Sequence, residues 1–393
     1  MATLEHPINV GAARRAMPAT ARLAYLNTGT SGPLPRPALE AMAAAASDEG
    51  QEGRLNPAAS QAFRQDAADL RALLAAYVGA DGSEIGLTHN TTEGVNIGVW
   101  GLNWKADDVC VTTTLEHPGG LLPLYQVHRR YGTQIVFADI GRGERDRTLE
   151  AMAQAIRPGV TLVVVSHVAW STGAVLPLRE ICDLAHRVGA LVCVDGAQSV
   201  GDIGLNMHQL GVDVYAFPGQ KWLCGPEGTG GLFVRQDQQE RIQPTFVGFQ
   251  SNDHDRYRPD DPSTLEFATG AQRYEVASVY RPGLKGLRAS VEWLAAQGPI
   301  PRAIEGLAQH CLRRVSELHG VDVLTPSNTE LSGLVAFTME GVDAVACTAY
   351  LAERAVAIRS IPDNQALRIS CGFFNTPAEI DRTVDLIREF ARR

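Results

Sequence analysis

The sequence lacks the long apolar runs and the charge bias that mark several classes of protein. No stretch approaches the ~18 uninterrupted apolar residues of a membrane helix, and the N-terminus lacks the charged-then-apolar order of a secretory signal. Positive charge is not in excess, because 35 Lys and Arg stand against 44 Asp and Glu, a net charge of -9. These absences argue against a membrane protein and against a surface for nucleic acid, and we expect a cytoplasmic protein.

Signatures of disulfides and of metal sites are also missing. The seven cysteines are an odd number and widely spaced, and several lie in apolar runs, so we expect reduced and mostly buried thiols. The acidic stretch Asp253–Asp261 superficially resembles a calcium loop but lacks its spacing. No metal site is therefore expected.

The chain of 393 residues is long enough for two domains and has an ordinary globular composition, with 45% hydrophobic and 20% charged residues. From about residue 85 to 235, short β-rich runs alternate with segments of helical periodicity, which predicts an α/β fold: a mainly parallel sheet with helices on both faces. Seven strands are expected, at Ile85–Thr88, Val109–Thr114, Gln134–Ala138, Thr161–Ser166, Ala190–Asp195, Val212–Ala216 and Gly230–Arg235. Helices between them include Gly119–Tyr131, Arg147–Ile156 and Leu178–Val188.

The C-terminal part has a different pattern. Polar, turn-rich sequence from Gln250 to Gln272 interrupts the alternation and predicts an active-site or interface loop. A smaller α+β domain is then predicted from helices at Ala289–Gln297, Ala303–Leu318 and Pro377–Arg392 and a strand at Gly333–Met339. We expect a large domain at 20–280 and a small C-terminal domain at 281–393 that includes residues 1–19.

A lysine follows one of the predicted strands, at the end of the turn Pro218-Gly219-Gln220-Lys221. In partly apolar surroundings a lysine loses its proton more easily, so its amine can form an imine with an aldehyde cofactor. Taken alone, a lysine beside a turn is more often a surface residue.

An aspartate ends another predicted strand. Asp195 follows the apolar run Ala190–Val194, at the edge where doubly wound sheets place their ligands. A carboxylate there can pair with a buried pyridinium and keep it protonated, and Gln198 can donate to a cofactor's phenolate oxygen. The alternative is an aspartate that caps the next helix.

Three further candidates accompany this pair. Thr91 and Thr92 open a helix after a strand, which offers phosphate both N–H donors and a helix dipole, although a capping box would look the same. His117 follows another strand, where it can stack on a planar ring near a leaving group; the alternative is a structural histidine. Arg368 lies between apolar neighbours, as a bidentate carboxylate clamp requires; a snorkelling surface arginine is the alternative.

With these residues in this order, the sequence resembles the class V aminotransferase family of fold type I pyridoxal-phosphate enzymes over nearly its whole length. Within that family it is similar to the L-cysteine/cystine C-S lyases. The resemblance rests on Trp100–Trp104, Glu116–Gly119, Ser166-His167 followed by Trp170, Asp195–Ser199, Gly225-Pro226 and Arg273–Ser278. Trp170 is informative because cysteine desulfurases usually carry an asparagine there.

The resemblance implies roles for the candidate residues. Pyridoxal 5'-phosphate would be carried by Lys221 as a Schiff base, with Lys221 later acting as the base and Asp195 as the partner of the pyridinium. The remaining cofactor contacts would come from Gln198 at O3', His117 as the stacking ring, Thr91, Thr92 and Gln220 at the phosphate, and Ser278 at the phosphate of the other subunit. The substrate would meet Arg368 at its carboxylate, Arg359 as a second cation, and Trp170.

The resemblance has one further consequence, and the sequence departs from the family pattern at one place. The position of Ser278 implies a homodimer with shared active sites. The usual Ser/Thr-x-His-Lys before the imine is here Pro218-Gly219-Gln220-Lys221, which removes one hydroxyl and replaces an imidazole with an amide.

The favoured reaction is β-elimination of L-cysteine or L-cystine to pyruvate, ammonia and sulfide or persulfide. The alternatives are an aminotransferase, an enzyme like the cysteine desulfurases or isopenicillin N epimerase, a lyase for another S-substituted cysteine, or a non-catalytic binding or sulfur-carrier relative. A desulfurase needs a thiol on the segment between the positions of Arg359 and Arg368, and Ser360–Leu367 contains no cysteine. The nearest thiol, Cys371, lies beyond Arg368 where a fixed strand end is expected.

Overall fold

The computed structural model describes residues 8–54, 57–253, 256–327 and 329–393. Its largest sheet has seven strands in the order β2-β8-β7-β6-β5-β3-β4. Their bounds are β2 Ile85–Thr88, β3 Val109–Thr113, β4 Gln134–Ala138, β5 Val160–Ser166, β6 Leu191–Asp195, β7 Val214–Pro218 and β8 Gly230–Val234. Strands β3 to β7 run parallel to one another, and β8 runs antiparallel to both β7 and β2. The predicted α/β fold with a mainly parallel seven-stranded sheet is confirmed.

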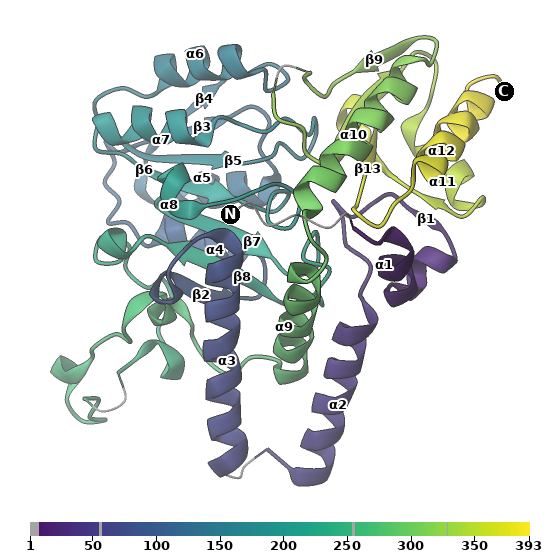
Figure 1. Ribbon diagram of the computed structural model, residues 1–393. Helices are drawn as coiled ribbons and strands as arrows, with labels where there is room; N and C mark the ends of the chain where they lie inside the picture. Colours follow the sequence, from purple (N-terminus) through teal and green to yellow (C-terminus); the bar gives the residue numbers. More distant parts are fainter. Residues whose placement is uncertain (1–7, 55–56, 254–255, 328) are drawn as a thin grey trace, which may run out of the picture.

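Helices cover both faces of this sheet (Figure 1), because successive side chains of a buried strand point to opposite sides. Along β5, Val163 and Val165 pack in a core with α6 (Arg145–Ala155) and α7 (Leu178–Arg187). Leu162 and Val164 pack in another core with α4 (Thr91–Trp100) and α5 (Pro118–Tyr131). The short helix α8 (Met207–Leu210) precedes β7.

Two long helices that sequence analysis does not predict, α2 (Arg36–Glu52) and α3 (Pro57–Val78), pack against α9 (Arg281–Ala295). Figure 1 shows α2 and α3 projecting together below the sheet. Helix α9 begins at Arg281 rather than at the predicted Ala289, because Pro282 suits the first turn of a helix. Gly286 allows the close approach of α9 to α2, since a Cβ there would lie 2.5 Å from Met42 Cγ.

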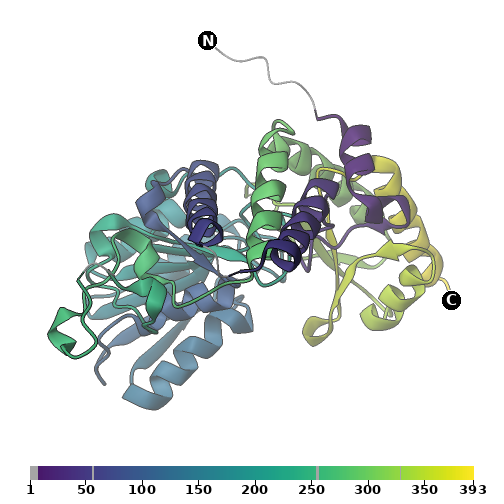
Figure 2. The ribbon, with the colours of Figure 1, turned by 90° about the horizontal axis from the view of Figure 1, so that it is seen from below.

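The C-terminal part forms a second lobe, which Figure 2 shows beside the first. Its antiparallel sheet has the order β12-β13-β10-β9. The strands are β9 Val321–Val323, β10 Leu334–Met339, β12 Arg359–Ile361 and β13 Ala366–Ser370, and the helices are α10 Ile300–Ser316, α11 Ala344–Ala352 and α12 Pro377–Phe390. A separate parallel pair joins β1 (Ala24–Tyr25) to β11 (Val356–Ala357), and α1 (Val10–Ala16) is held to α12 by an ion pair between Arg14 and Glu379. The predicted smaller α+β part is confirmed.

The two lobes have separate apolar cores, and α10 contributes to both. Ile300 and Ile304 belong to the core under the large sheet, whereas Cys311 and Val315 belong to the core of the small lobe. The domain boundary at residue 280 stays a prediction. In the part of the chain that the structure describes, no helix is long and apolar enough to cross a membrane.

The predicted loop at 250–272 has little regular structure. Its described residues, 250–253 and 256–272, contain only short 3-10 turns, such as Phe249–Ser251 and Pro262–Thr264. His254 and Asp255, which belong to the calcium-like stretch, lie outside the described residues, as do residues 1–7 of the N-terminal stretch assigned to the small domain.

Candidate functional site

One pocket gathers nearly all the candidate residues. It lies where the carboxyl ends of β5, β6 and β7 meet the first turns of α4 and α5, the edge at which parallel sheets bind ligands. Its volume is about 250 Å³. The predicted residues that line it are Thr91, Thr92, His117, Trp170, Asp195, Gln198, Gln220, Lys221, Arg359 and Arg368. We call it the Lys221 pocket; Ser278 is exposed and lies outside it.

Lys221 is held in the pocket directly after β7. The chain contains three lysines, and the other two lie elsewhere: Lys105 is exposed, and Lys285 pairs with Asp66. Burial lowers the pKa of Lys221 to about 8, against the opposing charge of Asp195, and the arginines Arg368 and Arg359 lower it further. The neutral, nucleophilic amine is therefore available near neutral pH.

The turn that carries Lys221 is covered by a segment that sequence analysis overlooks. The Gly32 amide donates to the Gln220 carbonyl at 2.7 Å, and a Cβ on Gly32 would lie 2.1 Å from the Lys221 carbonyl oxygen. Only glycine fits at such a close backbone approach. Gly29 and Thr30 of the same segment line the pocket, and the turn-rich residues 27–32 are the signal that could have revealed it.

Asp195 and Gln198 stand where β6 ends. Asp195 is 5% exposed, and its Oδ1 accepts the Ala197 amide at 2.9 Å. No helix follows, since 196–199 form a turn, so the capping alternative is wrong. Gln198 donates from Nε2 to the Gly29 carbonyl at 2.8 Å and accepts from Trp222 Nε1 at 3.0 Å. Its amide is thus fixed, and its nitrogen has a second hydrogen to offer.

His117 caps α5 and faces Trp170. The Gly119 amide donates to His117 Nδ1 at 3.0 Å, so the neutral ring carries its proton on Nε2. The two aromatic rings meet edge to face with centroids 5.3 Å apart. Burial lowers the pKa of His117, with Asp195 acting in the opposite direction.

Thr91 and Thr92 are the first residues of α4, and Asn90 caps the helix by accepting the Glu93 amide. The cap uses Asn90 and leaves Thr91 and Thr92 at the pocket, so capping does not exclude an anion at this helix start. Close by, Gln220 Oε1 is buried with no hydrogen-bond partner within the described chain.

The two C-terminal arginines are direct partners on a β-hairpin. Arg359 on β12 pairs in register with Arg368 on β13, so both side chains lie on one face. Arg368 is 1% exposed and donates from Nη1 to the Trp170 carbonyl at 2.7 Å, while its Nε and Nη2 have no partner within the described residues. Burial, with the charge of Arg359, lowers its pKa to about 9. A buried guanidinium whose nitrogens lack hydrogen-bond partners favours the binding of an anionic ligand.

Arg359 completes this cationic side of the pocket. It donates from Nη1 to Thr30 Oγ1 at 3.1 Å, and its guanidinium lies 5.9 Å from the centroid of the Trp170 ring. Its Nε is buried without a partner in the described part of the protein. Trp170 therefore contacts both cations and the His117 ring.

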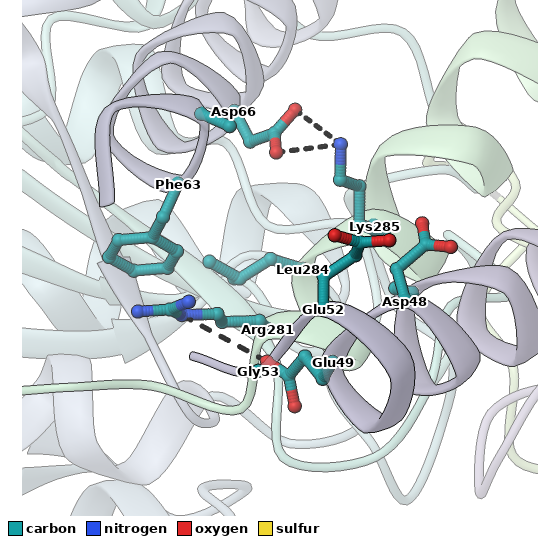
Figure 3. A pocket seen from close by; sticks show the side chains of 11 residues that line it. Asp48, Glu49, Glu52, Gly53, Phe63, Asp66, Arg281, Leu284 and Lys285 are labelled. Carbon is teal, nitrogen blue, oxygen red and sulfur yellow. Dashed lines mark hydrogen bonds and ion pairs between the residues drawn. The ribbon is translucent and has the colours of Figure 1, made fainter. Parts of the chain in front are cut away.

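A larger cavity lies elsewhere, between α2, α3 and α9, and Figure 3 shows it. Its volume is about 430 Å³, and none of the predicted site residues lines it. Lys285 pairs with Asp66, and the Arg281 guanidinium lies over the Phe63 ring at 4.9 Å from its centroid. We call it the α2–α3–α9 cavity.

A cluster of possible metal ligands also lies away from the pocket. Ligand atoms of Asp81, Glu84 and His208 lie within 4.8 Å of one another. The Glu84 oxygens already accept the Asp81 and Gln236 amides and contact His208 Nε2. The cluster is accounted for by these hydrogen bonds.

The comparisons with known proteins agree on one family. The family model described as Aminotransferase class-V matches residues 24–383. "Isopenicillin N epimerase" of Streptomyces clavuligerus is 31% identical over 92% of this chain and 93% of its own length. A "Probable cysteine desulfurase" of Methanothermobacter thermautotrophicus is 28% identical over 96% of this chain and 97% of its own.

Solved structures give the same result. A structure of C-DES with glycine covalently linked to its PLP cofactor superposes with a TM-score of 0.90 at 33% identity, covering 96% of this chain and 99% of the other. A complex of the cystine C-S lyase C-DES with its product, cysteine persulfide, gives 0.89 at 33% identity, covering 95% and 99%. With the family model matched over most of its length, the chain belongs to the class V aminotransferase family of pyridoxal-phosphate enzymes.

Proposed function

We propose that this protein is a pyridoxal-phosphate-dependent carbon-sulfur lyase that acts on L-cysteine or L-cystine. Cysteine and water would give pyruvate, ammonia and hydrogen sulfide; cystine and water would give pyruvate, ammonia and cysteine persulfide. The observation that carries the proposal is the β12–β13 hairpin, which presents two arginines to the pocket and no thiol between them. The likeness to the C-DES structures supports it.

The pocket fits the cofactor on its own chemistry. It offers a buried lysine whose pKa is lowered to about 8, a buried aspartate, and a helix start with two hydroxyls. We assign the aldehyde to Lys221, the ring nitrogen to Asp195, and the phosphate to Thr91, Thr92 and Gln220. When bound, the cofactor supplies an electron-withdrawing ring that accepts the electrons released when the Cα–H bond breaks.

Two side chains are assigned to move protons. Lys221 would act as the base that takes the Cα proton, a role that its lowered pKa favours near neutral pH. His117 carries its proton on Nε2, because Nδ1 accepts the Gly119 amide. We assign that Nε2 proton to the leaving sulfur, as the C–S bond breaks.

The arginine hairpin is assigned to the substrate. Arg368 binds the α-carboxylate through Nε and Nη2, the two groups that the protein leaves without a partner among its described residues. Arg359 is the second cation, placed to bind the distal carboxylate of cystine. Trp170 forms the wall between them and His117.

The β12–β13 hairpin contains no cysteine between Arg359 and Arg368 that could accept sulfur from the substrate. Cys371 directly follows β13, is fully buried, and donates its amide to the Gly333 carbonyl at 2.7 Å. Cys311 beside it and burial both raise the pKa of Cys371, so the thiol stays protonated. A protonated, buried thiol is a poor nucleophile toward substrate sulfur.

We also propose a homodimer with shared active sites. Ser278, assigned to the phosphate of a second subunit, is exposed and outside the Lys221 pocket of its own chain. Large apolar side chains are exposed at Tyr280, two residues after Ser278, and at Phe246 and Phe249, as an interface requires. The Gln250 amide donates to the Val276 carbonyl at 3.1 Å, so the segment that follows Phe249 lies beside the segment that carries Ser278. The cytoplasmic location stays a prediction.

The rival reactions are separated by one experiment. Purified protein loaded with pyridoxal phosphate is incubated with cysteine, cystine and S-methylcysteine without a keto acid, and pyruvate, sulfide and alanine are measured. Pyruvate in stoichiometric amount supports the lyase. Alanine together with protein-bound persulfide would indicate a desulfurase. Turnover that occurs only when a keto acid is added would indicate an aminotransferase. Inversion of the configuration at Cα without elimination would indicate an epimerase.

A further inference from the structure

Glu116 is a buried carboxylate next in the chain to the pocket residue His117, and the proposed function gives it no role. It lies between the end of β3 and His117, and it is 6% exposed. Its Oε1 accepts from Thr113 Oγ1 at 2.7 Å, and its Oε2 accepts from Ser166 Oγ at 2.6 Å. Among the described residues, no Lys, Arg or His forms an ion pair with it.

Its neighbour is the carboxylate assigned to the cofactor nitrogen. Ser166, which bonds to Glu116, is the register partner of Asp195 on the adjacent strand. A Cβ on Gly120 would lie 4.0 Å from both Asp195 Oδ2 and Glu116 Oε2. The first turn of α5 is thus faced by two buried carboxylates, and glycine at position 120 leaves the space beside both free.

The hydroxyl partners of Glu116 suit either of its charge states. A serine or threonine hydroxyl both donates and accepts, so Thr113 and Ser166 can serve a carboxylate or a carboxylic acid without moving. The groups that face Glu116 are these two hydroxyls, the Ser166 backbone amide, Asp195 from β6 and Gly120 from α5, with His117 next in the chain. Burial raises the pKa of Glu116 to about 7, against its hydrogen bonds, and the charge of Asp195 raises it further.

Resting on the proposed function, we propose that Glu116 is a positioning residue for the cofactor, a second carboxylate whose proton sets the charge behind Asp195 and so the protonation of the ring nitrogen. When Glu116 is neutral, Asp195 alone faces the nitrogen. When Glu116 loses its proton, the added negative charge favours a protonated ring. The affinity for the cofactor then depends on pH through Glu116.

The sign of this dependence is fixed. At pH 6, below its pKa of about 7, Glu116 is mostly protonated, and replacement by glutamine changes little, because the amide is neutral as well. Above pH 7 the parent gains a negative charge that the glutamine variant lacks. The parent should therefore bind the cofactor more tightly than Glu116→Gln at pH 8, by about threefold to tenfold, and equally at pH 6.

The test titrates cofactor-free protein with pyridoxal phosphate between pH 6 and 8 and follows tryptophan fluorescence. Parent, Glu116→Gln and Glu84→Gln are compared; Glu84 is a matched control, a buried glutamate away from the pocket that is bonded to His208. An affinity ratio between parent and Glu116→Gln that stays constant with pH overturns the proposal. Absence of cofactor binding in the parent overturns the proposed function instead.

A second measurement covers the case in which Glu116→Gln does not fold. The infrared carbonyl band of protonated carboxylic acids is titrated in the cofactor-free parent and in Glu116→Asp. A buried acid that loses its proton near pH 7 in the parent, and at a shifted pH in the aspartate variant, supports the proposal. A parent spectrum without any acid titrating between pH 6 and 8 contradicts it.

Discussion

The Lys221 pocket and the α2–α3–α9 cavity differ in whether their charged side chains are paired with partners from the protein. In the cavity, the larger of the two, Asp66 pairs with both Lys285 and Arg288. In the pocket, Arg368 is 1% exposed, and two of its nitrogens have no partner within the described residues. Buried charge that the protein leaves unpaired, rather than volume, therefore distinguishes a ligand site from a gap between helices.

The largest difference between the two places is expected when one lysine is removed from each. We expect Lys221→Ala to lose at least about a thousandfold in turnover, because Lys105 and Lys285, the other two lysines of the chain, do not line the pocket and cannot replace its amine. The bound-cofactor absorbance near about 410 to 430 nm should vanish with it. Lys285→Ala, in the α2–α3–α9 cavity, should keep both. Steady-state kinetics and an absorbance spectrum decide this; activity above a few percent in Lys221→Ala would remove that residue from its role.

The difference between the two places is only partly readable from sequence. Asp195 and Lys221 are predictable, because Asp195 ends one apolar strand and Lys221 follows another, and the alternation of strands and helices along the chain marks both strand ends. The helices around the cavity are harder to predict. In α2, for example, the alanine-rich sequence has few strongly apolar residues that would mark a buried face. The pairing of Arg359 with Arg368 is a matter of strand register, which two short strands separated by a turn do not reveal.

The segment that covers the Lys221 turn, residues 27–32, is difficult to predict for a related reason. Gly29 and Gly32 lie far in sequence from the residues that they contact, Gln198 and the Lys221 turn. Periodicity describes only local structure, so a loop that folds back over a distant turn leaves no periodic signal. Glu116 is visible in sequence, but its burial beside Asp195 appears only once the strands are ordered.

The second prediction removes the carboxylate assigned to the ring nitrogen. We expect Asp195→Ala to lower kcat about a hundredfold, because an unprotonated pyridine is a poor electron sink. Cofactor binding should weaken but remain measurable, since Lys221 and the threonines are untouched. Turnover and the absorbance spectrum are measured together at saturating cofactor. A loss in kcat of less than about tenfold, or roughly 1.4 kcal/mol, would mean that Asp195 does not have this role.

The third prediction tests whether the unpaired charge of the pocket serves the substrate. Arg368→Ala should lower kcat/KM about tenfold to thirtyfold, mainly through KM, because it removes a charge-assisted pair worth about 1.5 to 2 kcal/mol. Arg359→Ala should weaken cystine more than cysteine, since cystine alone has a second carboxylate. The ratio of the two kcat/KM values is the measurement. Equal losses for both substrates in Arg359→Ala would contradict the assignment, and so would an unchanged kcat/KM in Arg368→Ala.

The smallest effect is expected from the one thiol that follows the arginine hairpin. Cys371 lies behind β13, with its thiol buried against Cys311 and its pKa raised, so it cannot supply the thiolate that a sulfur acceptor needs. Cys371→Ser should therefore turn over at close to the parent rate per folded molecule, although a buried hydroxyl will cost stability, about 1 to 3 kcal/mol if it finds no partner. Alanine should be negligible beside pyruvate in both proteins.

The decisive measurement is product analysis with mass spectrometry of the protein after cysteine or cystine turnover, run at a temperature where both variants are folded. A persulfide on Cys371, or alanine in stoichiometric amount that disappears in Cys371→Ser, would replace the lyase with a desulfurase and show that a buried thiol can reach the pocket.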